Sequence, residues 1–157
     1  MIKKFLQKIF KIVSYGVFFK IYGKISKSIG YKDNSNIDVK IVDLGSNLKY
    51  RVYKIYSGRL YTDRIHDTAI ILDHSIIEGP SFQLRYTHDS KMYNSKIEDN
   101  VVFKKGTPRK LRKINSTVLS LLTGGGGNAN YWHWLFDVLP RLFLCNKSFG
   151  LGEIDYF

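Results

Sequence analysis

The chain has 157 residues, of which 44% are hydrophobic and 15% aromatic, and its formal net charge is +12. So apolar a composition offsets the entropy lost on folding and excludes a wholly disordered chain, and the length suits one domain with a core. The single cysteine, Cys145, excludes an intrachain disulfide and favours a reducing compartment. No group of cysteine and histidine residues has the spacing of a zinc site, so no metal site is predicted.

The N-terminal segment carries most of the positive charge. Residues 1–32 hold eight lysines and no acidic residue, whereas the remaining 125 residues hold 17 basic and 13 acidic side chains. The lysines of this segment are Lys3, Lys4, Lys8, Lys11, Lys20, Lys24, Lys27 and Lys32. Its longest uncharged stretch, residues 12–19, is far shorter than the roughly 20 apolar residues that a membrane-spanning helix needs, and no clear secretory signal is present.

At about 100° per residue, residues 1–32 are predicted to form a basic amphipathic helix. Its apolar side holds Ile2, Phe5, Ile9 and Ile12, and its basic side holds Lys4, Lys8 and Lys11. Two uses of this helix stay open: residues 1–30 lie on an anionic membrane surface with the lysines reaching outward, or the helix packs on the rest of the protein. Nucleic-acid binding is a weaker interpretation, because no recognised motif accompanies the charge.

Residues 33–157 are predicted to form the second unit, which begins with a polar linker at residues 31–38 and a β-rich part at 39–86. Asp73 and His74 separate two short β-branched runs, which predicts a hairpin turn. Pro80 ends that ladder, "SFQLRY" predicts a further strand, and residues 87–100 are predicted to be an exposed loop. The basic residues between 104 and 113 either meet a phosphate or form a solvated face, and the second is the more usual case.

Residues 115–157 are predicted to begin a βαβ unit, and hence a parallel sheet covered by helices. "STVLSLLTG" is the first strand, "NYWHWLFDVLPRLFLC" has helical spacing, and "IDYF" begins the next strand. Ligands of such sheets lie outside the carboxyl ends of the strands, which here is the glycine loop Gly124, Gly125, Gly126 and Gly127. The loop matches neither a dinucleotide fingerprint nor a Walker motif, so it is a weak signal for phosphate binding.

One arc of the helix collects polar side chains that a buried helix would not tolerate without partners. The arc holds Asn130, His133, Trp134, Asp137 and Arg141, the last only if the helix survives Pro140, which should kink or end it. Trp132 and Phe136 fall on the opposite side and are expected in the core. The arc is therefore predicted to line a polar cavity or to be paired internally.

His133 and Asp137 are four residues apart and can touch on a helix. A carboxylate beside an imidazole orients the ring, which suits a general base, but a structural pair has the same spacing. Arg141 stays protonated, so it is expected to pair with Asp137 or with an anionic group of a substrate rather than to act as the base.

At this point "NYWHWLFDVLPRL" resembles the signature of glycosyltransferase family 61. The matching residues are Asn130, Tyr131, His133, Trp134, Asp137, Leu139, Pro140 and Arg141. The upstream "GRLYTDRIHDTAIILDHSIIEGPSFQLR" resembles the β-rich segment of bacterial members, so the likeness covers roughly residues 50–157. The helix motif is the more specific part.

The resemblance implies inverting transfer of a sugar from a nucleotide-sugar donor to a glycan or glycolipid acceptor, with no cofactor beyond that donor. It implies the two-domain GT-B fold, an α/β architecture with two Rossmann-like halves, and a role in capsule or lipopolysaccharide synthesis on the cytoplasmic face of the cell membrane. Such enzymes need several hundred residues, so this chain is expected to be an N-terminal fragment without the donor half. A fragment of this kind is expected to be inactive alone.

Two other functions compete with this expectation. The charge and the aromatic content suit a nucleic-acid-binding module, in which basic and exposed aromatic residues interleave. The aromatics here crowd into one helix and the lysines into the N-terminus, so no nucleic-acid partner is expected. A membrane-surface protein without chemistry would need only residues 1–30 and would leave the polar arc unexplained.

Overall fold

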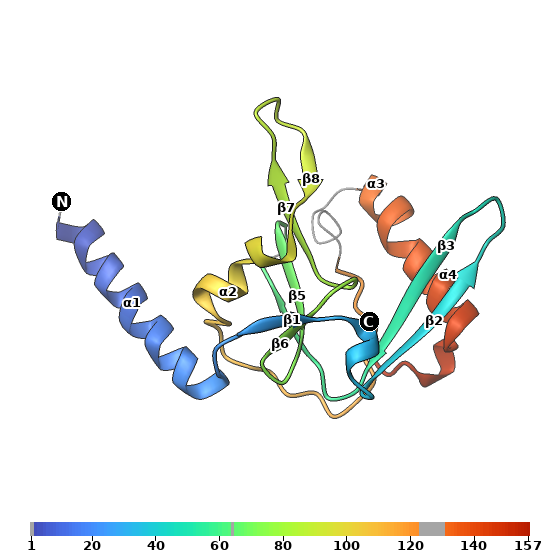
Figure 1. The fold of residues 1–157 in the computed structure, drawn as a ribbon, viewed down its shortest axis with the longest axis horizontal. Coiled ribbons are helices and arrows are strands. Elements are labelled where there is room, and N and C mark those ends of the chain that lie inside the picture. The colour runs from blue at the N-terminus through green and yellow to red at the C-terminus, as the bar shows by residue number, and fades with distance from the viewer. Residues whose placement is uncertain (1, 64, 123–130) are drawn as a thin grey trace.

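The structure is a computed structural model that describes residues 2–63, 65–122 and 131–157. It is a mixed α/β protein, as the sequence predicts, with one curled sheet, a separate two-stranded ribbon and few helices (Figure 1). A long helix lies at one end, and a helical segment alongside the ribbon lies at the other.

The main sheet has six strands in the order β1-β6-β5-β7-β8, and β4 pairs with β5 beside this path. Its strands are β1 (Lys27–Ile29), β4 (Arg59–Thr62), β5 (Asp67–Leu72), β6 (Ser75–Ile77), β7 (Phe82–Tyr86) and β8 (Met92–Asn94). β1 and β6 are parallel, and the other pairs are antiparallel. The predicted hairpin turn is confirmed, because Asp73 adopts φ 52° between β5 and β6.

The ribbon pairs β2 (Ile37–Asp43) with β3 (Lys49–Ile55) in antiparallel register. Two segments predicted as loops contain short regular elements. The segment 87–100 is not a plain loop, because it contains β8 and the 3₁₀ turn η2 (Ile97–Asp99). The linker before β2 contains another 3₁₀ turn, η1 (Tyr31–Asp33).

The N-terminal helix α1 (Ile2–Tyr22) forms as predicted but ends ten residues before residue 32. Gly23 ends it, because its φ of 77° favours glycine and its N–H bonds back to the Phe19 oxygen at 3.0 Å. Residues 27–29 then enter the sheet as β1, which sequence reasoning placed in the helix. No helix in the described ranges is long and apolar enough to cross a membrane.

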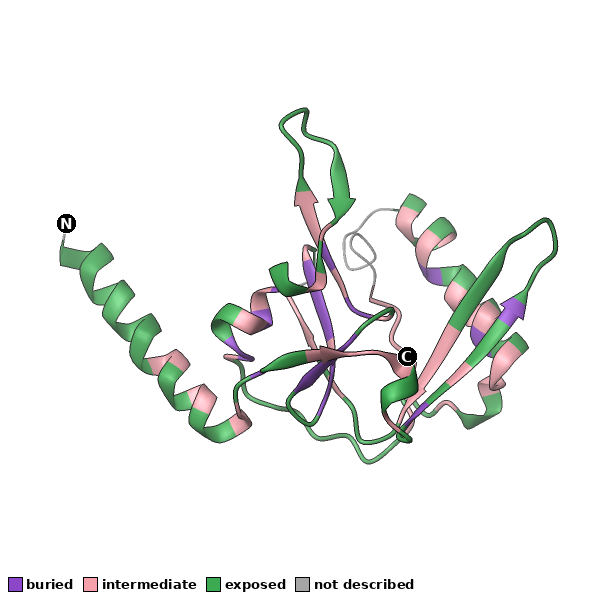
Figure 2. Ribbon diagram, in the orientation of Figure 1, coloured by how far each residue is buried: buried purple, intermediate pink, exposed green. Residues whose placement is uncertain are grey.

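Two small apolar clusters form the core around the sheet (Figure 2). The first is built from Ile25, Ala69, Ile71, Ile76 and Val102, and the second from Ile37, Leu72 and Ile77. β5 and β6 contribute to both clusters, since these strands are buried on both faces. The apolar runs that predicted this hairpin therefore mark the centre of the molecule.

A buried carboxylate joins the sheet to the short helix α2 (Val101–Lys105). Asp67, only 4% exposed, accepts two hydrogen bonds from the Arg85 guanidinium at 3.1 and 2.9 Å and one from the Val101 N–H at 2.9 Å. Asn100, fully buried, donates to the Thr68 and Phe82 oxygens at 3.3 Å. No local sequence pattern predicts this network.

Gly106, which ends α2, is expected to tolerate no side chain. Its φ of 61° is strained for other residues, and a Cβ would lie 2.7 Å from Phe19 Cε1 of α1. Gly106→Ala should therefore destabilise the protein by about 1–3 kcal/mol and loosen α1, measured by urea unfolding and by proteolysis near Tyr22. Gly152→Ala is the control, because nothing lies within 4 Å of its Cβ, and equal effects of the two would contradict this account.

The last part of the chain is a nearly continuous helical segment. It comprises α3 (Tyr131–His133), the π-helical turn η3 (Trp134–Val138) and α4 (Leu139–Ser148), followed by the 3₁₀ turn η4 (Leu151–Glu153). The predicted flanking strands are not formed as strands: Val118 and Tyr156 make one isolated parallel bridge, and Val118 is 46% exposed. α4 packs instead against β2 and β3, with Val138 and Cys145 buried.

Candidate active site

His133 and Asp137 contact each other directly on the helical segment. His133 Nδ1 lies 2.6 Å from Asp137 Oδ2, and the two side chains are 38% and 42% exposed. The i,i+4 contact predicted from the sequence is therefore present. The pair is half open to solvent, so a substrate can reach it without a rearrangement of the core.

The geometry assigns the proton of the neutral imidazole. An ionised carboxylate only accepts hydrogen bonds, so Nδ1 of His133 must carry the hydrogen that bridges to Asp137. Nε2 then holds a lone pair and can take a proton from a hydroxyl group brought to it. The contact with Asp137 holds the ring in this orientation.

The helix passes through Pro140 by widening one turn. Proline has no N–H to give to the Phe136 oxygen, and its ring would crowd that carbonyl in a regular α-helix. In η3 the Leu139 N–H bonds to the Trp134 oxygen, five residues back, so this turn holds one residue more than an α turn. The helix therefore does not end at Pro140, as the sequence allowed, and α4 continues to Ser148.

Two aromatic side chains of this segment do not lie where the sequence predicts. Trp132 and Phe136, expected in the core, are 67% and 64% exposed and stack on each other with ring centroids 5.3 Å apart. The packing against β2 and β3 is made by α4, further along the segment. Trp134 is 46% exposed, so aromatic surface lies on the same short segment as His133 and Asp137.

Arg141 is anchored to the segment that precedes the glycine loop. Its Nη1 donates to the Ser120 oxygen at 3.4 Å. Burial lowers the pKa of Arg141, and the nearby charge of Asp137 acts in the opposite direction. The guanidinium therefore interacts electrostatically with Asp137, but it donates its hydrogen bond to the backbone.

Several predicted site residues lie outside the described residues. Asn130 and the loop Gly124, Gly125, Gly126 and Gly127 all fall in residues 123–130. The structure therefore brings together His133, Asp137, Trp134 and Arg141 on one segment, and the predicted loop at its start stays a prediction.

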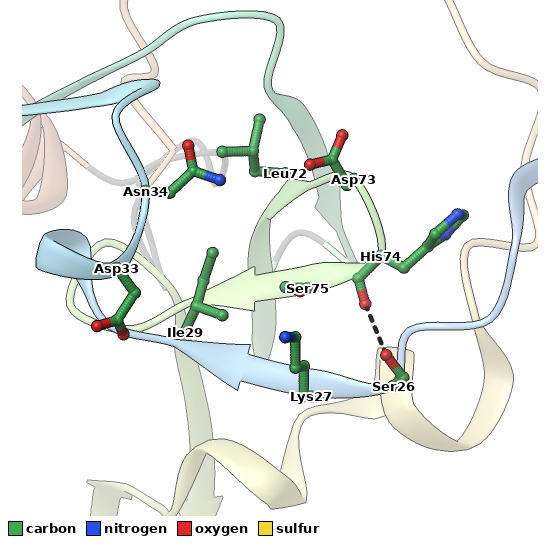
Figure 3. A pocket seen from close by; sticks show the side chains of 9 residues that line it. All are labelled: Ser26, Lys27, Ile29, Asp33, Asn34, Leu72, Asp73, His74 and Ser75. Carbon is green, nitrogen blue, oxygen red and sulfur yellow. Dashed lines mark hydrogen bonds between the residues drawn. The ribbon is translucent and has the colours of Figure 1, made fainter.

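Two open hollows of the described part lie elsewhere. One, of about 460 Å³, is at the β7–β8 tip around Tyr86, His88 and Tyr93. The other, of about 310 Å³, lies between β1 and the β5–β6 turn, and in Figure 3 Lys27 points into it while the His74 ring points away. Neither includes His133 or Asp137, and a cleft beside the pair stays a prediction.

A second histidine–aspartate pair sits at the β4–β5 turn and has a structural role. Asp63 Oδ1 accepts the N–H groups of Ile65, His66 and Asp67 at 2.8–3.0 Å. Partial burial opposes ionisation, but these three donors lower the pKa of Asp63 below its usual value. His66 Nδ1 lies 3.8 Å from Asp63 Oδ2, a longer distance than the 2.6 Å between His133 and Asp137.

Two other kinds of ligand site were considered in the sequence, a metal site and a phosphate site in the basic cluster. Across residues 2–63, 65–122 and 131–157, no three histidine, cysteine or carboxylate side chains gather as a metal-binding group. The basic residues Lys104, Lys105, Arg109, Lys110, Arg112 and Lys113 are exposed to solvent.

Comparisons of the chain with protein-family models, with curated proteins and with solved structures found no match. The likeness to glycosyltransferase family 61 therefore depends on the motif residues themselves.

Proposed function

We propose that the chain forms the acceptor-side part of an inverting glycosyltransferase, with His133 as the general base and Asp137 as the residue that positions it. The contact that carries this proposal is the 2.6 Å hydrogen bond between His133 Nδ1 and Asp137 Oδ2 on a half-exposed segment. It supports the proposal because it directs the lone pair of Nε2 outward from the pair.

The proposed reaction has one proton transfer and one exchange of bonds at carbon. His133 Nε2 takes the proton of an acceptor hydroxyl while that oxygen forms a bond to the anomeric carbon of the donor sugar. The bond from that carbon to the phosphate oxygen breaks, and the nucleoside diphosphate leaves with the electron pair. Attack from the face opposite the leaving group inverts the anomeric configuration.

The surroundings of the pair suit a sugar acceptor. Trp132, Trp134 and Phe136 expose aromatic surface on the same short segment as His133, and apolar rings with a few polar groups are typical of ligand sites. In this proposal the donor nucleotide binds a second Rossmann-like half of a GT-B fold, and the acceptor is a glycan or glycolipid of a surface polysaccharide. The donor sugar is not assigned.

A nucleic-acid-binding function is less well supported. Single-strand binding needs aromatic and basic side chains together along one groove. Both tryptophans, Trp132 and Trp134, lie on α3 and η3, whereas the lysine-rich α1 lies at the opposite end of the molecule (Figure 1).

An NMR titration of the 157-residue chain tests the proposal. Soluble glycans should shift the indole N–H signals of Trp132 and Trp134 and the ring signals of His133. UDP-, GDP- and CMP-sugars should leave these signals unchanged, because the donor half is a separate unit. Shifts from nucleotide-sugars at these residues, or none from any glycan tested, would contradict the acceptor-side assignment.

A further inference from the structure

The helix α1 exposes an apolar surface that nothing in the described structure covers. None of its residues is buried, and Ile2, Phe10 and Phe5 are 76%, 73% and 64% exposed. Figure 2 shows the first turns exposed all round and partly buried positions only toward the end of the helix. An exposed apolar surface of this extent marks an interaction site.

The body of the protein holds α1 by the C-terminal part of the helix, where partly buried residues begin at Ser14. Phe19 packs against Gly106, and the Tyr22 hydroxyl accepts the Leu111 N–H at 3.0 Å. Arg59 donates to the Tyr22 oxygen at 3.4 Å and lies over its ring. The attachment is therefore a small aromatic joint at the C-terminal end of the helix.

The joint and the apolar surface lie on opposite sides of α1. At about 100° per residue, Phe19 and Tyr22 fall on the same side as Lys4, Lys8 and Lys11. The opposite side holds exposed apolar residues, which therefore point away from the body: Ile2, Leu6, Val13 and Val17. A helix in a membrane interface needs this arrangement, with the polar side and the folded domain toward water.

A second group of positive charges flanks the joint. Residues 106–111 pass along the end of α1, since Gly106 meets Phe19 and Leu111 meets Tyr22. Lys104 and Lys105 precede this stretch, Arg109 and Lys110 belong to it, and all four are exposed. They add positive charge to that of the lysines of α1.

We propose that α1 lies in the headgroup region of an anionic lipid membrane, with its apolar side in the acyl boundary and its lysines among the headgroups. Charge decides for lipid over a second copy of this chain. Two copies paired through α1 would bring eight lysines of each N-terminal segment together without an acidic residue before Asp33 to neutralise them. Anionic lipid supplies the missing negative charge.

Vesicle co-sedimentation of the full chain tests this proposal. Vesicles of phosphatidylcholine with phosphatidylserine should bind the protein at least about tenfold more tightly than pure phosphatidylcholine, and the difference should shrink with added salt. The double variant Phe5→Gln, Phe10→Gln should lose at least about tenfold in affinity for the anionic vesicles. The control is Ile41→Gln on β2, because Ile41 is 63% exposed, like Phe5 at 64%, but lies outside α1.

Three results would overturn the proposal. They are equal binding to both vesicles, loss of binding in Ile41→Gln as large as in the double variant, and a dimer in light scattering that the double variant abolishes. Circular dichroism checks that each variant keeps its fold. The test does not depend on sugar transfer, so its failure would leave the proposed role of His133 untouched.

Discussion

Replacing His133 by alanine or Asp137 by asparagine is expected to lower sugar-transfer turnover by about 10²-fold or more in the proposed transferase. His133→Ala removes the proton acceptor. Asp137→Asn allows an amide N–H₂ to face Nδ1, which favours the tautomer with its proton on Nε2. The measurement is steady-state turnover, with the melting temperature of each variant.

Stability should hardly change in these variants. The pair is half exposed, and an i,i+4 pair contributes about 0.2–0.5 kcal/mol, which corresponds to a melting shift of about 2 °C or less. His66→Ala is the matched control, because His66 is 40% exposed and also faces an aspartate, at 3.8 Å. If the His133 and Asp137 variants both unfold, the pair has a structural role. If both keep full activity, the base lies elsewhere.

The largest loss of stability is expected from Asp67→Ala. This change removes both hydrogen bonds to Arg85 and leaves the Val101 N–H at the start of α2 without its acceptor. Breaking a fully buried pair costs about 3–5 kcal/mol, and the 30% exposure of Arg85 reduces this to about 2–4 kcal/mol. A loss of this size is a large part of the stability of a typical domain.

Urea unfolding of Asp67→Ala and Lys49→Ala measures this effect against a matched ion pair. Lys49 lies 3.4 Å from Asp43, but both side chains are more than half exposed, so its removal should cost less than about 1 kcal/mol. Asp67→Asn should fall between wild type and Asp67→Ala, because an amide oxygen can still accept the Val101 N–H. Similar losses in Asp67→Ala and Lys49→Ala would show that the network does not hold α2.

Local sequence signals predicted the parts of the fold that local physics determines. The β5–β6 hairpin follows from two β-branched runs around Asp73 and His74, and α1 follows from its apolar periodicity. The pairing of β1 with β6 joins residues 27–29 to 75–77, and no short-range pattern encodes such a contact. Asp67 and Arg85 meet for the same reason across 18 residues.

The candidate site was predictable in its contact but not in its surroundings. The spacing of His133 and Asp137 predicts their hydrogen bond, because i,i+4 residues stay adjacent on a helix. Trp132 and Phe136 were misplaced, because helical spacing separates two sides of a helix but does not show which part of it packs on the body, and α4 makes the contacts with β2 and β3. The wide turn of η3 was not predicted either, although Pro140 was the available signal of a change in the helix.

The protonation state of His133 is the most direct test of the proposed base. Long-range ¹H–¹⁵N correlation spectra of the ring near pH 8 report which nitrogen carries the hydrogen of the neutral imidazole. We expect the hydrogen on Nδ1 and a lone pair on Nε2 in the wild type, and a mixture of tautomers in Asp137→Ala. A hydrogen on Nε2 in the wild type would leave no lone pair for an acceptor hydroxyl and would contradict the assignment of His133 as the base.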